Sequence, residues 1–383
     1  MRKMKLAQFV TNAVHESSDD KKIRGIKENH LDTFVLGGGD NARRVIRALD
    51  KRNVPVAGCL VDDVYYQKGK ECAGYEVRPL SSVMHHSSPV NLVIGFDNPA
   101  RVRERVQDAR LQQLGHVVLF DLPYKNNTLD RDFLLKHLSE FDQTYQMLAD
   151  DLSRDVMLAY LERRTSSIQK EGLQDLAKYW VSEQYFNELS EGCALPLEHA
   201  VFVDCGAFDG DTAEAIHRKY ADVERIYAFE PGRESFARLK RRQQEIPELY
   251  PLPLAAWSRR ETLLFSGANG TDGHITLDQD EGVRVQADTI DHVLAGKPAN
   301  FIKMDLEGGE LPALKGAEGT IRSFMPMLAV CVYHKDSDLF AIPQYIRSLA
   351  EENPDADYAY YLRQHSYHSA EMVFYAVPRR KTK

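Results

Sequence analysis

The sequence predicts an α/β protein with two Rossmann-like, doubly wound domains joined by a helical segment. Strand-like apolar runs alternate with helix-like stretches in two separate parts of the chain, which is typical of parallel sheets with crossover helices. Each part opens with an apolar strand, a glycine-containing turn and the start of a helix. We expect an N-terminal arm at 1–30, a first domain at 31–123, a helical linker at 124–195 and a second domain at 196–383.

Apolar runs in the first domain predict four strands and an early helix. The strands are expected at Thr33–Gly37, Val54–Val61, Val90–Gly95 and His116–Asp121, and the helix at Asn41–Asp50. The arm before them is polar and aperiodic, so we expect it to be loosely ordered or to form a short helix.

Apolar residues recur in steps of three or four in the linker, which predicts an amphipathic helix face. They are Leu134, Leu138, Phe141, Tyr145, Leu148, Leu152 and Val156. This face could bridge the two sheets, form a homodimer contact, or simply pack on its own domains.

The second domain shows seven strand-like runs, enough for a complete doubly wound sheet. The strands are expected at Ala200–Asp204, Arg225–Phe229, Pro251–Ala256, Asn300–Asp305, Met327–Tyr333, Tyr358–Leu362 and Met372–Val377. Helices are expected at Asp211–Tyr220, Arg233–Gln244, Leu311–Ser323 and Leu339–Glu351.

The composition argues against several classes of protein. The 383 residues are 43% apolar and 28% charged, as in ordinary globular chains. The net charge of −8 argues against nucleic acid as the partner, and no apolar run has the length of a membrane span. The five cysteines form no CxxC pair and the N-terminus is a poor signal peptide, so we expect a cytoplasmic protein without disulfides.

The stretch Val201–Thr212 opens the second domain with an apolar strand, an acidic residue, two glycines and a helix start. A dinucleotide-binding loop would have three glycines around a pyrophosphate. This loop instead has three carboxylates, those of Asp204, Asp209 and Asp211. Carboxylates repel a pyrophosphate and attract a sulfonium and an α-amino group. The loop therefore favours S-adenosylmethionine over NAD as the cofactor.

Acidic residues also end two further strands of this domain. Glu230 lies 26 positions after Asp204, where a carboxylate can accept hydrogen bonds from both ribose hydroxyls, although alone it could be a surface acid. Asp305 and Glu307 end the fourth strand ahead of two glycines, as in an active site. Glu307 and Glu310 could instead be favourable charges at a helix N-terminus.

These stretches together resemble the FkbM family of methyltransferases. The resemblance rests on VDCGAFDGDT, YAFEP and KMDLEGGELPALKGA, the last preceded by Thr289–Ile290–Asp291, and it spans residues 180–378. Gln184–Tyr185–Phe186 also resembles a segment of some members. This sequence departs from the family pattern at Phe208 and Asp209, where many members have Asn-Ile, so an amide donor is lost.

The resemblance implies a seven-stranded methyltransferase fold, S-adenosylmethionine as the cofactor, and methyl transfer to a hydroxyl of a sugar, glycan or natural product. The acceptor is therefore expected to be a small molecule or glycan, with a nucleotide-sugar as one option. The expected cofactor contacts are Asp204, Gly206, Ala207, Phe208, Asp209, Gly210, Thr212, Glu230, Ala256 and Asp305.

Transfer to an unactivated hydroxyl needs a group that removes its proton. His334, at the end of the fifth strand, is the expected base because the usual histidine pKa of about 6.5 suits proton uptake near neutrality. Asp305 or Glu307 could instead be the base, or could orient His334. No spacing demands a metal, so none is expected.

The first domain has its own glycine turn at Gly37, Gly38 and Gly39, and its second strand ends at Asp62. This pattern resembles the nucleotide-binding domain of bacterial sugar acyltransferases, which implies a nucleotide site with Asp97 on the same rim. The glycines could equally serve tight packing.

Two other functions remain open. One is an NAD-dependent oxidoreductase or epimerase that uses the first domain, although the sequence there has no Tyr-xxx-Lys pair and no complete GxGxxG. The other is a scaffold that binds S-adenosylmethionine or a nucleotide without turnover. The glycine-containing loop Ser266–His274 could close over a site or simply form turns.

Overall fold

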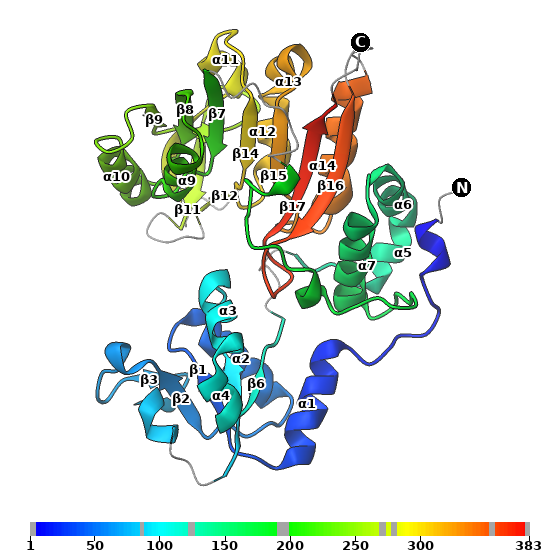
Figure 1. Ribbon diagram of the computed structural model, residues 1–383, viewed down its shortest axis with the longest axis vertical. Coiled ribbons are helices and arrows are strands. Elements are labelled where there is room, and N and C mark those ends of the chain that lie inside the picture. The colour runs from blue at the N-terminus through cyan, green and yellow to red at the C-terminus, as the bar shows by residue number, and fades with distance from the viewer. Residues whose placement is uncertain are drawn as a thin grey trace.

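The computed structural model describes residues 5–84, 88–121, 127–189, 199–267, 273–276, 282–351 and 357–379. Figure 1 shows an N-terminal lobe in blue and cyan, a C-terminal lobe in green to red, and a group of helices beside the C-terminal sheet. Each lobe has one mostly parallel sheet, which confirms the predicted α/β class.

The N-terminal sheet has the order β3-β4-β2-β1-β5-β6, and only the β3–β4 pair is antiparallel. Its strands are β1 (Thr33–Leu36), β2 (Gly58–Val61), β3 (Glu71–Cys72), β4 (Tyr75–Pro79), β5 (Val90–Ile94) and β6 (Gly115–Val118). Its helices are α1 (Ser18–Asn29), α2 (Asp40–Lys51), α3 (Pro99–Gln107) and α4 (Ala109–Leu114). The strand predicted at Val54–Val61 begins only at Gly58, after Pro55, which has no N–H for a ladder.

The apolar positions predicted to form a helix face are distributed over three helices of the linker, with Leu148 between two of them. The helices are α5 (Arg131–Lys136), α6 (Leu138–Met147) and α7 (Asp151–Thr165). The chain leaves the helical path at Leu148, which pairs with Tyr360, and Asp150 then caps α7. Most apolar side chains of these helices belong to the same core as the C-terminal sheet, so the helices pack on that lobe, whereas Leu135 and the predicted face residue Leu152 are exposed.

The C-terminal sheet has seven strands in the order β16-β17-β15-β14-β7-β8-β9, as predicted in number. They are β7 (Ala200–Cys205), β8 (Val223–Phe229), β9 (Leu249–Leu252), β14 (Phe301–Met304), β15 (Met327–Cys331), β16 (Tyr358–Gln364) and β17 (Met372–Pro378). The helices are α9 (Asp211–Lys219), α10 (Arg233–Arg242), α11 (Ile290–Leu294), α12 (Glu310–Lys315), α13 (Glu318–Phe324) and α14 (Asp338–Glu351), so the helix predicted at Leu311–Ser323 is in fact two.

A second, four-stranded sheet in this lobe was not predicted. It consists of β10 (Ala255–Ala256), β13 (Val283–Asp288), β11 (Glu261–Ser266) and β12 (His274–Thr276). The strand expected at Pro251–Ala256 is divided, because β9 ends in the large sheet and β10 begins the small one. The predicted closing loop lies partly outside the described residues, at 268–272.

Side chains join the two lobes directly. The carboxylate of Asp121 accepts hydrogen bonds from the backbone N–H and the hydroxyl of Ser369, each at 2.7 Å. The guanidinium of Arg103, on α3, lies 4.1 Å from the ring centroid of Trp180. In the part of the chain that the structure describes, no helix has the length and apolarity that crossing a membrane requires.

Candidate active site

A cavity of about 400 Å³ opens at the carboxyl ends of β7, β8 and β14. Ligands bind at this edge of an open parallel sheet because the loops that follow neighbouring strands diverge there. The predicted residues that line it are Gly206, Phe208, Thr212, Glu230, Ala256, Asp305 and Glu307. The wall formed by the described residues does not include Asp204, Ala207, Asp209, Gly210 or His334.

The glycine turn after β7 is required by packing as well as by the cavity. Gly206 has φ +85°, and a Cβ there would lie 1.9 Å from the carbonyl oxygen of Asp305. Gly210 has φ +89°, and its Cβ would meet Leu239 and Arg242 at about 3 Å. Gly206 lets the strand ends of β7 and β14 approach closely, which brings Asp305 next to the turn, whereas Gly210 lets the turn approach α10.

Asp204 is buried behind the cavity and forms an ion pair with Lys303. Its Oδ1 lies 3.1 Å from the Lys303 Nζ, and that ammonium also donates to the Gly206 carbonyl at 2.8 Å. Burial alone would lower the pKa of Lys303, but the carboxylates of Asp204 and Asp305 raise it. The pair therefore joins two neighbouring strands and holds the glycine turn.

Glu230 presents a nearly buried carboxylate to the cavity. It accepts backbone hydrogen bonds from Phe208 at 2.9 Å and from Gly232 at 2.7 Å. Burial raises the pKa of Glu230 to about 7, against the lowering effect of these two N–H groups. The two N–H bonds fix the orientation of the carboxylate, and its remaining lone pairs can accept hydroxyl donors.

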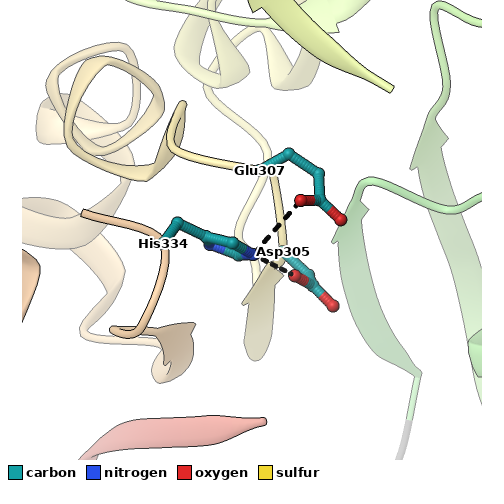
Figure 2. A group of neighbouring side chains, drawn as sticks. All are labelled: Asp305, Glu307 and His334. Atoms are coloured by element: carbon teal, nitrogen blue, oxygen red, sulfur yellow. Dashed lines mark ion pairs between the residues drawn. The ribbon is translucent and has the colours of Figure 1, made fainter. Parts of the chain in front are cut away.

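Asp305, Glu307 and His334 come together at the carboxyl ends of β14 and β15 (Figure 2). The His334 Nε2 lies 3.5 Å from Asp305 Oδ1 and 3.6 Å from Glu307 Oε2, and its Nδ1 lies 2.9 Å from Glu310 Oε1. His334 is fully buried, whereas Asp305 and Glu307 line the cavity. The histidine thus lies behind the two carboxylates that a substrate would meet.

The surroundings of His334 do not suit the predicted base. Burial alone would lower its pKa, but the carboxylates of Glu310, Glu307 and Asp305 raise the pKa to about 10. An imidazolium at neutral pH has no lone pair with which to accept a proton. The prediction used the usual histidine pKa, from which three carboxylates that folding places beside the imidazole raise the pKa of His334.

The same group includes donors that divalent cations accept. One atom each from Asp305, Glu307 and His334 lies within 4.8 Å of the others, and Glu310, His334 and Asp338 form a similar, fully buried set. Imidazole nitrogen and carboxylate oxygen are ordinary metal ligands. Ion pairing between His334 and the carboxylates accounts for the first set equally well.

Several polar side chains of the cavity were not among the predicted site residues, and Tyr185 and Glu371 are two of them. The Tyr185 hydroxyl donates to Asp305 Oδ2 at 3.0 Å, and Glu371 accepts from Gln184 at 2.9 Å. Burial and the nearby Asp305 raise the pKa of Glu371 to about 7. The Gln184–Tyr185–Phe186 resemblance was a signal for Tyr185, whereas Glu371 follows no motif in the sequence.

Backbone strain is concentrated around this cavity. Four of its lining residues have positive φ without being glycine, namely Tyr185 (66°), Phe208 (45°), Glu307 (54°) and Glu371 (59°). Such conformations cost about 1–3 kcal/mol each and persist where the surrounding structure holds them, often at functional sites. Their clustering supports this cavity as the functional centre of the lobe.

A second cavity of about 400 Å³ lies in the N-terminal lobe. Four of the residues predicted for a nucleotide site line it, namely Gly37, Gly38, Gly39 and Asp62. Asp97 does not line it within the described residues.

Residues 204–360 match the family described as Methyltransferase FkbM domain. A crystal structure of methyltransferase FkbM from Methylobacillus flagellatus KT is 21% identical, has a TM-score of 0.58, and aligns over 96% of this chain and 94% of that one. It therefore shares the fold over nearly the whole length. No curated protein matches.

Two other solved structures align with about half of this chain. An rRNA methylase from Streptococcus thermophilus is 13% identical over 50% of this chain and 92% of its own, with a TM-score of 0.33. Aeropyrum pernix fibrillarin, solved with bound S-adenosyl-L-methionine, is 11% identical over 48% of this chain and 68% of its own, with a TM-score of 0.31. The family match places a methyltransferase domain of the FkbM type at residues 204–360, so this chain is a methyltransferase.

Proposed function

We propose that this methyltransferase takes the methyl group from S-adenosylmethionine and transfers it to a hydroxyl oxygen of a sugar, glycan or natural product. The observation that carries the cofactor assignment is Glu230. Its buried carboxylate is oriented by two backbone N–H groups, faces the cavity and can accept both ribose hydroxyls. S-adenosylmethionine, when bound, supplies a methyl group on a positively charged sulfur.

The carboxylates around the cavity suit a cationic cofactor. Five carboxylates line it, together with the ammonium of Lys303, and they are those of Asp211, Glu230, Asp305, Glu307 and Glu371. Their negative charge favours a sulfonium and an α-amino group and disfavours a pyrophosphate. This charge pattern argues against NAD in the C-terminal lobe.

The side chains nearest the strand ends have separate roles in this proposal. Asp305 or Glu307 accepts the hydroxyl proton, since both line the cavity. Burial alone would raise the pKa of Asp305, but the ammonium of Lys303 and the imidazolium of His334 lower it and keep Asp305 ionised. His334 orients the two carboxylates, and Tyr185 holds the second oxygen of Asp305.

Titration with S-adenosylhomocysteine in a calorimeter tests the cofactor site. We expect micromolar binding to the wild-type protein and a loss of about 100-fold in Glu230→Ala, because hydrogen bonds to a charged group contribute about 1.5–3 kcal/mol each. Glu230→Gln is the conservative variant for folding, since it keeps the side-chain shape and one of the two oxygens that accept the N–H groups. Absence of binding to the wild type at millimolar ligand would rule out the proposal.

A scaffold without catalysis predicts the same binding but no chemistry. The second measurement is therefore turnover of labelled S-adenosylmethionine against sugars, glycans and nucleotide-sugars. If the wild type transfers the methyl group to a hydroxyl acceptor and Asp305→Asn does not, the result supports a catalytic function. Tight cofactor binding with no transfer to any of these acceptors would favour the scaffold.

A further inference from the structure

The cavity of the N-terminal lobe lies at the carboxyl ends of β1, β2 and β5. These strands are adjacent in the sheet, with β1 between β2 and β5, so the chain order reverses at β1. That is where open parallel sheets bind ligands. The wall contains, besides the glycine turn, Leu36, Asp40, Asn41, Val61, Asp62, Tyr65, Lys70, Val77, Gly95, Phe96, Arg101 and Arg105.

Gly37 and Gly39 of this turn have different structural roles. A Cβ on Gly37 would lie 2.7 Å from the Gly95 carbonyl oxygen, so that glycine serves packing. Gly39 has φ −97°, which any residue adopts, and a Cβ there would meet nothing within 4 Å. Gly39 is exposed, caps α2 and lines the cavity, so contacts with neighbouring atoms do not explain its missing side chain.

The charges of the cavity suit a phosphorylated ligand. Lys70, Arg101 and Arg105 line it, together with the carboxylates of Asp40 and Asp62. Asp62 lies 2.8 Å from Arg105 and 3.9 Å from Arg101, so its charge is balanced. Arg105 also lies 3.5 Å from Glu104 and 3.6 Å from Asp108, so a phosphate would meet chiefly Lys70 and Arg101. Asp62 follows β2, the position from which a carboxylate can accept ribose hydroxyls, and the basic side chains can bind phosphate.

Apolar and aromatic groups complete a nucleoside-sized slot. Val61, Val77 and Phe96 line the cavity, and Tyr65 does so with the guanidinium of Arg101 5.0 Å from its ring centroid. A nucleobase is a flat, largely apolar group that binds against such surfaces. The volume, about 400 Å³, is in the range of small-molecule sites.

The two cavities are close neighbours. Phe96 lines the N-terminal cavity, and Asn98, two residues later, lines the methyl-transfer cavity. Two residues of extended chain span only about 7 Å. Asn98 caps α3, and Figure 1 shows α3 directed from the N-terminal lobe toward the C-terminal lobe.

We propose that the acceptor is a nucleoside diphosphate-linked sugar whose nucleoside diphosphate binds in the N-terminal cavity and whose sugar hydroxyl reaches past Asn98 into the methyl-transfer cavity. This inference rests on the proposed function. The sugar oxygen forms a bond to the methyl carbon, the carbon–sulfur bond breaks with its electron pair left on sulfur, and the hydroxyl proton passes to a carboxylate.

Calorimetry on the full chain with UDP, GDP, CDP and dTDP tests the site. At least one of these nucleotides should bind with micromolar affinity. Gly39→Val should weaken that binding at least tenfold, because it adds an isopropyl group to a residue of the cavity wall without straining the backbone. Gly25→Val, on α1 where a Cβ also meets nothing, is the matched control and should bind as the wild type does.

S-adenosylhomocysteine affinity separates this inference from the proposed function. The affinity of Gly39→Val for S-adenosylhomocysteine should stay within twofold of the wild-type value. If the wild type does not bind S-adenosylhomocysteine at all, the proposed function fails, whereas the nucleotide site is still tested by nucleotide binding. The inference is overturned if no nucleotide binds at millimolar concentration, or if Gly39→Val binds it normally. It is also overturned if sugars linked to the bound nucleotide accept no methyl group while other acceptors do.

Discussion

Glu230 is the residue whose ionisation should control cofactor affinity. Its pKa of about 7 is raised by burial, and ribose hydroxyls donate to the charged carboxylate, so binding favours the ionised form. Affinity for S-adenosylhomocysteine should therefore rise with pH up to about 7 and fall by up to tenfold per unit below it. Calorimetry from pH 5.5 to 8.5 measures this, and Glu230→Gln should flatten the profile. A wild-type profile without this limb would contradict the assignment.

His334 should contribute to stability through its charge. Its pKa of about 10 lies above the unfolded value of 6.5, so the contribution is full below pH 6.5 and is lost as pH rises through 10. His334→Ala leaves Glu310 buried without its imidazolium partner, so we expect a loss of about 3–5 kcal/mol in the free energy of unfolding at pH 7.

Denaturant unfolding of His334→Ala between pH 6 and 10 checks this expectation. Wild-type stability should approach that of the variant at the alkaline end. Unchanged stability together with a turnover profile that loses a limb near pH 6.5 would restore the histidine as the base.

A Glu307 variant and a chelator experiment distinguish proton acceptance by this carboxylate from metal binding. Glu307→Gln should reduce kcat by about 10²-fold or more, as loss of a positioned acid–base group does, with S-adenosylhomocysteine affinity unchanged within threefold. Turnover of the wild type in EDTA should equal turnover without it. Loss of activity in EDTA that Mg²⁺ or Mn²⁺ restores would instead make Asp305, Glu307 and His334 a cation site.

At the scale of the element, the catalytic edge depends on how closely β7 and β14 approach. Gly206→Ala would combine a positive φ with a Cβ 1.9 Å from the Asp305 carbonyl, so the strand ends must separate. We expect a loss of about 2–4 kcal/mol in unfolding free energy. Gly172→Ala is the control, because its φ is also positive but its Cβ meets nothing, and it should cost about 1 kcal/mol. Equal losses would show that packing at Gly206 is unimportant.

The position of the small sheet, like that of the break between α12 and α13, depends on close contact between segments that are distant in the chain. Trp257, just after β10, lines the cavity and belongs to the apolar cluster of the small sheet. A Cβ on Gly316, between α12 and α13, would lie 2.0 Å from the Trp257 carbonyl oxygen. The break between these helices therefore brings the chain against β10 and the cavity wall.

For the whole molecule, Asp121 links the lobes that contribute to the methyl-transfer cavity. Asp121→Ala removes both hydrogen bonds to Ser369, so we expect a loss of about 1–3 kcal/mol. Scanning calorimetry should then resolve two transitions, of which only one shifts upward with S-adenosylhomocysteine. A single transition with an unchanged midpoint would mean that the lobes are held together by other contacts.

Local patterns in the sequence were enough to predict the alternation of strands and helices and the positions of the glycine turns. They also identified the acids at three strand ends, because apolar periodicity and turn chemistry involve residues near one another in the chain. Gly206, Glu230 and Asp305 line one cavity for this reason: the carboxyl ends of parallel strands meet at one edge.

Tertiary structure alone decided what surrounds these groups. Asp204 is paired with Lys303, 99 positions away, rather than lining the cavity, and Glu371 reaches the site from the loop before the last strand. His334 is held as a cation by two carboxylates from the turn after β14 and one from the start of α12. The pKa of a buried group depends on which charges folding places beside it, and those charges come from positions that no local pattern connects.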